Sequence, residues 1–210
     1  MKKIFTFIFL FITLIAAAPM TLKNNVPMPI VLPIEDEHED VKVLLCKVPE
    51  SEREEFVNIL KSFGDARNLD WKFCLLIMWG ESHIDTKAVG GNFVGLIMFG
   101  THARAYLKVS KEQLLQMNHV EQAKAAVAIW EANEKAAKTK IDCFQKLQMA
   151  TFLPGLMAHP GNPYPVSNAI RSQNSALCDA NGQLTRESIL NIFRKKINLY
   201  DELKYFRGKI

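Results

Sequence analysis

This chain of 210 residues has little net charge, and that shortage narrows the classes of partner that it could bind. Lysine and arginine number 26 and aspartate and glutamate number 22, which gives a formal charge of +4 at pH 7. Loss of Lys2 and Lys3 with a leader peptide would leave +2. No dense Lys/Arg stripe with interleaved aromatic residues is present, so we expect no nucleic-acid partner. The hydrophobic share of 49% argues against wholesale disorder, and the length fits one domain, or one domain with appendages.

Several motifs with known chemistry are also missing. The sequence has no glycine-rich phosphate loop and no Gly-x-Ser-x-Gly nucleophile elbow, so it does not support serine-hydrolase chemistry. Its four cysteines are widely spaced, without a C-x-x-C pair, so metal-ligand spacing is absent. In an oxidising compartment they could form two disulfides in three connectivities, or they could stay buried thiols, and both alternatives remain open. The four are Cys46, Cys74, Cys143 and Cys178.

The N-terminal segment, residues 1–18, is typical of a secretory signal peptide. Two lysines precede a largely apolar stretch that ends in small residues, with an Ala16-x-Ala18 cleavage site. The stretch is short for a membrane-spanning helix, which needs about 20 residues, and an uncleaved anchor is the alternative. We therefore expect a secreted or periplasmic protein, attached to a membrane only if the segment is not cleaved.

The next segment, residues 19–45, is expected to be a linker rich in proline and acidic residues. It contains four prolines between residues 19 and 34, and five of the six residues from Glu35 to Asp40 are acidic. Such a segment offers little apolar surface to bury, so we expect it to be dispensable for folding.

From residue 46 onward the patterning is mainly helical. Capping boxes mark several helix starts, and the helix after Asp70 is apolar almost all round, as is typical of a buried helix. The expected elements are helices that start at Ser51, Asp70, Ser110, Asn118 and Thr185, a helix over residues 140–153, a small hairpin within residues 85–100, and a loop over residues 159–183.

Glu81, at the end of the buried helix, is the residue that carries most information about chemistry. Desolvation by apolar neighbours such as Trp79 would raise the pKa of its carboxyl group, and the negative end of the helix dipole would act in the same direction. Glycoside cleavage requires such a carboxyl group, protonated near neutral pH and able to donate a proton to the leaving oxygen. Physical chemistry alone, however, favours an ordinary exposed glutamate at a helix end.

The spacing around Glu81 adds a family resemblance. Glu81-Ser82-x-x-Asp85 and Ala88-Val89 are followed by Val94-Gly95-Leu96-Ile97-Met98. This arrangement resembles the catalytic segment of the soluble lytic transglycosylase family, whose bacterial and phage members cleave peptidoglycan and share the lysozyme-like fold. The resemblance covers roughly residues 50–157 and is closest over residues 71–100.

The resemblance implies a mainly α fold. A lysozyme-like helical domain would occupy residues 46–158, with a small β-hairpin and loop region beside the cleft. The loop and C-terminal helix of residues 159–210 would be packed on this domain or appended to it.

The resemblance also implies an enzyme, an exported lytic transglycosylase that cleaves the β-1,4 bond between N-acetylmuramic acid and N-acetylglucosamine. Glu81 would be the single acid and base, and Ser82 would orient it by hydrogen bonding. The acetamido group of the substrate would stabilise the sugar cation, and the C6 hydroxyl would attack to give a 1,6-anhydro product, so no cofactor is needed. The partners would be peptidoglycan glycan strands bound by a monomer. The residues that would contact the substrate beside Ser82 are Gly95, Leu96, Met98 and Phe152.

Two positions depart from the family pattern. Met98 stands where the family usually has glutamine and Phe152 where it usually has tyrosine, and both changes remove hydrogen-bonding groups from the expected cleft. They indicate a divergent subfamily, and they also motivate an alternative, a non-catalytic glycan-binding or phage structural protein that keeps the fold. A lysozyme-type muramidase is a further alternative. It would need a second carboxylate, for which Asp85 is the nearby candidate, although we expect Asp85 to be a turn residue.

Three remaining features carry less weight. His83 and His102 flank the expected cleft and could contact substrate or simply lie at the surface. The stretch 179–187 is similar to a calcium-loop-like segment of some phage-type transglycosylases. It is two residues too short and lacks the ligand at position 5, so we expect a plain turn at Asn181-Gly182 and no metal.

Overall fold

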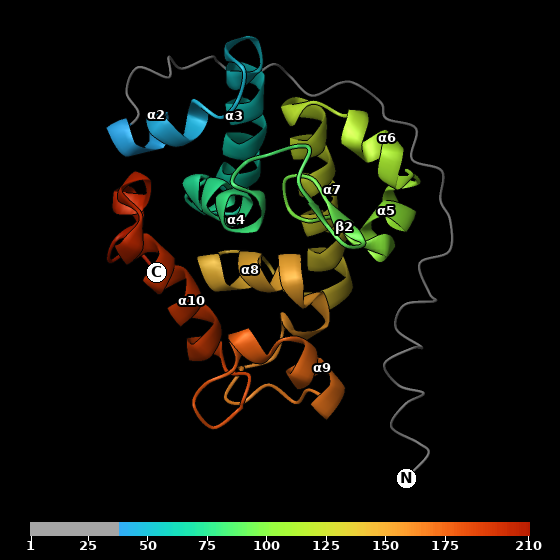
Figure 1. Cartoon of the computed structure of the whole chain (residues 1–210), viewed down its shortest axis with the longest axis vertical. Coiled ribbons are helices and arrows are strands. Elements are labelled where there is room, and N and C mark those ends of the chain that lie inside the picture. Colours follow the sequence, from blue (N-terminus) through green and yellow to red (C-terminus); the bar gives the residue numbers. More distant parts are fainter. Residues whose placement is uncertain (1–37) are drawn as a thin grey trace. The chain divides into compact units, whose positions relative to one another are not determined.

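The computed structural model describes residues 38–210 (Figure 1). The expected signal peptide and the expected linker up to residue 37 lie outside the described residues. The described part is mainly helical with a small two-stranded antiparallel sheet, which confirms the mainly α class with a small hairpin. Among residues 38–210, no helix is long and apolar enough to cross a membrane. The elements are α2 (Glu39–Leu45), α3 (Glu50–Asp65), α4 (Lys72–Ser82), β1 (Val89–Gly90), β2 (Phe93–Val94), α5 (Thr101–Leu107), α6 (Lys111–Gln116), α7 (His119–Ala137), α8 (Phe144–Phe152), η2 (Pro154–Leu156), α9 (Asn168–Gln173), η3 (Ser175–Leu177), α10 (Arg186–Leu199) and η4 (Asp201–Phe206).

Helix α4 lies in the hydrophobic core, as its apolar sequence predicts. Every residue from Cys74 to Trp79 is at most 2% exposed, and the helix packs against α2 and α8. The N-cap of α4 is Trp71 and not the predicted Asp70, so the helix begins one residue later than expected. Asp70 still contributes to this start, because one of its carboxylate oxygens accepts the backbone N–H of Lys72 at 3.0 Å. A helix that is apolar on every side has to be covered on every side, so its neighbours are drawn from distant parts of the chain.

Helix α7 is a second helix of the core, and its small residues allow close packing. Ala123 and Ala126 are fully buried, and the helix packs against α3 and α8. The ring of Trp130 lies 5.3 Å from the ring of Phe63 on α3, measured between centroids. The capping box of Asn118 with Glu121 is present at the start of α7, as predicted.

The other predicted helix starts have mixed outcomes. The capping boxes at Ser110 and Thr185 are present. The prediction at Ser51 is wrong, because α3 begins one residue earlier, with Pro49 at the N-cap and no side-chain cap. The fixed φ of proline suits a helix entry, which places Ser51 inside the first turn. The helix expected over residues 140–153 begins later, at Phe144.

The prediction of a linker over residues 19–45 is wrong for the last seven of these residues. Residues Glu39–Leu45 form α2, which packs against α4 and η4. Val41, Leu44 and Leu45 are at most 2% exposed. Their i, i+3, i+4 spacing places them on one face of the helix, so the acidic residues before them do not keep this segment out of the core.

The C-terminal residues 159–210 are packed on the rest of the described chain. In Figure 1, α10 (red) runs beside α8 (orange), and the rings of Phe193 and Phe144 lie 5.2 Å apart. η4 then packs against α2 and α10. The loop expected over residues 159–183 contains a short helix, α9, whose start is capped by the Ser167 hydroxyl group.

Candidate active site

Glu81 lies in the last turn of α4, where the buried helix reaches the surface. It is partly buried, and its carboxylate makes no hydrogen bond or ion pair with any described residue. Burial raises the pKa of Glu81 from its ordinary 4.5 to about 7, and the nearby positive charge of Lys196 opposes that rise. At neutral pH a carboxyl group of this kind is protonated about half of the time, so it can both donate and accept a proton.

Ser82 joins the end of α4 to the loop that follows the hairpin. Its hydroxyl group lies 2.9 Å from the carbonyl oxygen of Leu96 and 3.1 Å from that of Met78. It also accepts the backbone N–H of Asp85 at 3.2 Å. The prediction that Ser82 orients Glu81 by a hydrogen bond is therefore wrong, because its partners are backbone groups and Glu81 is not among them. Ser82 instead holds Leu96 beside the helix end that carries Glu81.

The chain reverses direction directly after Ser82 through two residues with left-handed backbone. His83 has φ +57° and Ile84 has φ +62°, which is rare for a β-branched residue. Such a conformation costs about 1–3 kcal/mol and persists only where the surroundings hold it. Here Ile84 is 1% exposed, and its carbonyl oxygen lies 3.2 Å from the Nε2 atom of His119 on α7. The direction in which the chain leaves the Glu81 turn is thus fixed by packing.

Gln122 on α7 binds the backbone of the segment that follows Glu81, and it was not among the residues predicted from the sequence. It is fully buried, and its Oε1 atom accepts the N–H of Leu96 at 2.9 Å. Its Nε2 atom donates to the carbonyl oxygens of Thr86 and Leu114, both at 2.9 Å. A polar residue among the alanines of α7 was the available signal, but its partners are not adjacent in sequence.

Gly95 and Leu96 both pack against Gln122. Gly95 has φ +77°, and a Cβ atom at this position would lie 2.3 Å from the Oε1 atom of Gln122, so only glycine fits. Leu96 is fully buried, its N–H is bound by Gln122 and its carbonyl by Ser82. The prediction that backbone groups of residues 95–99 line a sugar cleft is therefore wrong for Leu96, since both its polar backbone groups have partners inside the protein.

Met98 packs against the hairpin. The two strands pair in the register Val89 with Val94 and Gly90 with Phe93, and a Cβ atom at Gly90 would lie 2.6 Å from the terminal methyl carbon of Met98. Met98 is itself partly buried and has φ +51°. Its methyl group therefore contributes to the packing of the hairpin.

Phe152 lies at the end of α8 and faces the C-terminal helix. Its ring centroid is 6.5 Å from that of Phe193, edge to face. Phe193 also touches the end of α4, because a Cβ atom at Gly80 would lie 2.6 Å from its Cε1 atom. The ring of Phe193 thus lies between Phe152 and the residue that precedes Glu81.

The other candidate residues are exposed at the surface or stabilise turns by binding backbone N–H groups. Asp85 is exposed and accepts the backbone N–H of Lys87 at 2.7 Å, as expected of a turn residue. His83 is exposed and stacks on Trp79, with ring centroids 4.7 Å apart. His102 is exposed on α5. The Asp179 carboxylate accepts the N–H groups of Asn181 and Gln183, both at 2.9 Å, which forms the expected plain turn.

Groups that could bind a metal are not gathered anywhere in residues 38–210, where no set of three or more His, Cys, Asp or Glu side chains is close enough. All four cysteines are free thiols. Cys74 is fully buried in α4, and burial raises the pKa of its thiol group.

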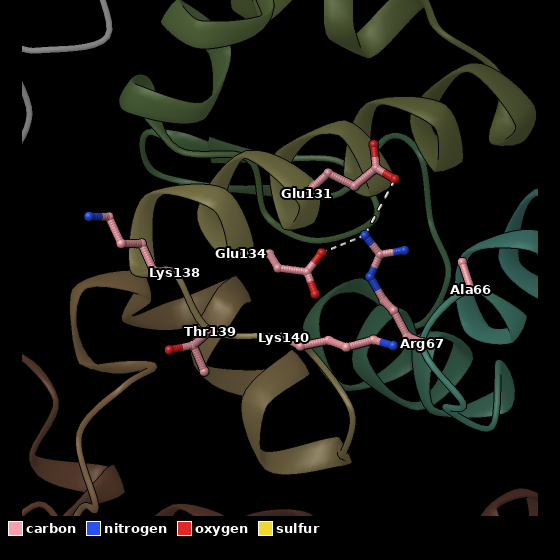
Figure 2. A pocket seen from close by; sticks show the side chains of 7 residues that line it. All are labelled: Ala66, Arg67, Glu131, Glu134, Lys138, Thr139 and Lys140. Atoms are coloured by element: carbon pink, nitrogen blue, oxygen red, sulfur yellow. Dashed lines mark hydrogen bonds and ion pairs between the residues drawn. The ribbon is translucent and has the colours of Figure 1, made fainter.

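Two surface hollows lie away from these residues. The first is drawn in Figure 2, where Arg67, after α3, points toward Glu131 and Glu134 on α7. The Nη2 atom of Arg67 lies 2.6 Å from Glu134 and 3.5 Å from Glu131. The second hollow, in the C-terminal segment, includes Cys178 and Lys195 in its lining. Neither hollow is lined by Glu81 or by any residue predicted to contact substrate.

Comparison of the chain with family models, with curated proteins and with solved structures finds no match.

Proposed function

We propose that this chain is an exported peptidoglycan lytic transglycosylase with a lysozyme-like helical domain and a single catalytic acid and base, Glu81. The observation that carries the proposal is the state of that carboxyl group. It lies at the end of a buried helix, has no hydrogen-bond or ion-pair partner among the described residues, and has a pKa raised to about 7. The motif spacing around it, described above, supplies the substrate class.

In this mechanism Glu81 first donates its proton to the glycosidic oxygen as the bond to the anomeric carbon breaks. The acetamido group of the same sugar stabilises the positive charge at that carbon. Glu81, now a carboxylate, takes the proton of the C6 hydroxyl, whose oxygen attacks the anomeric carbon and closes a 1,6-anhydro ring. The proton balance closes within one residue, no water is consumed, and no cofactor takes part.

The experiment is digestion of purified peptidoglycan by the mature protein, with the products identified by mass spectrometry. A lytic transglycosylase gives anhydro products, which are lighter by one water than the products of a hydrolase. Glu81→Gln keeps the shape of the side chain but cannot donate a proton, so its rate should fall by about 10²–10⁴-fold. The rate of the wild-type protein should decline as the pH rises through about 7, because the first step needs protonated Glu81.

Asp85→Asn is the matched control, because it removes the other nearby carboxylate from an exposed turn. Equal rates for Glu81→Gln and the wild type would refute the proposal. Hydrolytic products together with a large loss in Asp85→Asn would instead assign the muramidase reaction.

A non-catalytic glycan-binding protein is the second candidate, and specific contacts favour it. Leu96 has no free backbone polar group, Met98 packs on the hairpin, and Phe152 packs on Phe193. The same experiment separates the two candidates, since a glycan-binding protein would sediment with peptidoglycan without releasing any product.

A further inference from the structure

The C-terminal helix α10 packs directly on the turn of α4 that carries Glu81. Gly80 makes this approach possible, because a Cβ atom there would lie 2.6 Å from the Cε1 atom of Phe193, so any other residue would force the ring to shift. Phe193 is 3% exposed. The surroundings of Glu81 are therefore built partly by a segment more than 100 residues later in the chain.

Lys196 follows Phe193 by three residues, so both side chains lie on the same face of α10. Its Nζ atom donates a hydrogen bond to the carbonyl oxygen of Gly80 at 3.0 Å. The ammonium group also lies over the rings of Trp79 and Phe193, 6.0 and 5.8 Å from their centroids. Three separate contacts thus hold this cation at the carbonyl end of α4, where a positive charge is favourable.

The cation is close to Glu81 without forming an ion pair with it. No ion pair joins the two in the described residues, yet the charge of Lys196 lowers the pKa of Glu81 against the effect of burial. A direct ion pair would keep the carboxyl group ionised and would remove its ability to donate a proton. The hydrogen bond to Gly80 instead holds the ammonium group to the backbone.

Other titratable groups near this turn face Trp79. His83, on the same turn as Glu81, stacks on the Trp79 ring. Tyr200, just after α10, meets that ring edge to face, with centroids 4.9 Å apart. Among the described residues, Lys196 is the charged group that acts on the Glu81 carboxyl.

We propose that Lys196 is a positioning residue for Glu81: held by the Gly80 carbonyl, it places one positive charge beside a carboxyl group that stays unpaired. This inference rests on the proposed function in that it gives Glu81 its working range of pH. Without the charge, Glu81 would bind its proton too tightly to act as the base in the second step. With the charge in direct contact, it would not hold a proton for the first step.

The test uses the full mature chain and measures the titration of the Glu81 carboxyl carbon by 13C NMR, beside the pH profile of peptidoglycan cleavage. Lys196→Met and Lys196→Gln remove the charge, Lys196→Arg restores it, and Lys195→Met removes a neighbouring exposed charge as the control. We expect the pKa of Glu81 to rise by about one pH unit in both neutral variants. The alkaline limb of the activity profile should move by the same amount, and Lys196→Arg and Lys195→Met should resemble the wild type.

The two readouts separate this inference from the proposed function. An unchanged Glu81 titration in a folded neutral variant overturns the role of Lys196, whatever the activity. A shifted titration in a protein that cleaves no peptidoglycan would support the coupling of Lys196 to Glu81 and would refute the proposed reaction. A loss of activity in Lys196→Met that Lys196→Arg does not rescue, with no shift in the titration, would assign Lys196 a packing role only.

Discussion

The raised pKa of Glu81 should make the wild-type protein less stable in alkali than its Glu81→Gln variant. Between pH 4.5 and about 7, folded Glu81 holds a proton that the unfolded chain has released. The free energy of unfolding therefore falls as the pH rises through this window, and the loss is complete above pH 7. A change from 4.5 to about 7 corresponds to about 3 kcal/mol, at roughly 1.4 kcal/mol for each tenfold change in proton affinity.

Glu81→Gln removes this cost, because glutamine is neutral at every pH. We expect the variant to exceed the wild type by up to about 3 kcal/mol at pH 8 and to match it closely near pH 4. The assay is urea unfolding of both proteins at pH 4, 6 and 8, followed by circular dichroism. Glu54→Gln, on an exposed position of α3, is the matched control for the loss of one negative charge.

The pH dependence is what discriminates, because a simple packing difference between glutamate and glutamine would be the same at pH 4 and pH 8. A constant stability difference across the three values, or a less stable variant at pH 8, would refute the reasoning that burial dominates the environment of Glu81. It would also remove the observation on which the proposed function rests.

Two further predictions concern the parts that support the site. Gln122→Leu should lower the free energy of unfolding by about 3 kcal/mol or more, because it leaves the Leu96 N–H and two carbonyl groups buried without partners. Gln116→Leu, at an exposed position of α6, is the control in the same urea titration. Equal stability of the two variants would contradict the role of Gln122. A chain that begins at Cys46 should unfold at a clearly lower temperature than one that begins at His38, because it lacks the buried side chains of Val41, Leu44 and Leu45. Burial of each of these side chains contributes about 1.5–3 kcal/mol. Identical melting temperatures would show that α2 adds nothing to the stability of the core.

The features that could be predicted from sequence are those whose causes are local. The starts of α6, α7 and α10 follow from a capping residue and its partner three positions later. The burial of α4 follows from its own composition, and this places Glu81 at the end of a core helix. Helix α2 could also have been predicted, because Val41, Leu44 and Leu45 have helical spacing. The prolines and acidic residues before them indicated a linker instead.

The rest depends on contacts between distant residues. Gln122 binds Leu96 and Thr86, 26 and 36 positions earlier, and no local pattern marks such pairs. Ser82 was assigned to the wrong partner for the same reason, because its true partner, Leu96, comes close only once the loop has folded. Lys196 contacts Gly80 across 116 positions, and its own surroundings in the sequence are an ordinary amphipathic helix.

The packing of Phe193 on Gly80 also affects the order in which parts of the protein can fold during synthesis. Glu81 leaves the ribosome well before Phe193 and Lys196, and at 5–20 residues per second the interval lasts roughly 6–20 s. Throughout that time the last turn of α4 lacks the ring and the cation that cover it in the finished protein. The surroundings of Glu81 are thus assembled last, by contacts that close a very long loop. A nascent chain, or a chain that ends before α10, has the Glu81 carboxyl group without the contacts that Phe193 and Lys196 make beside it.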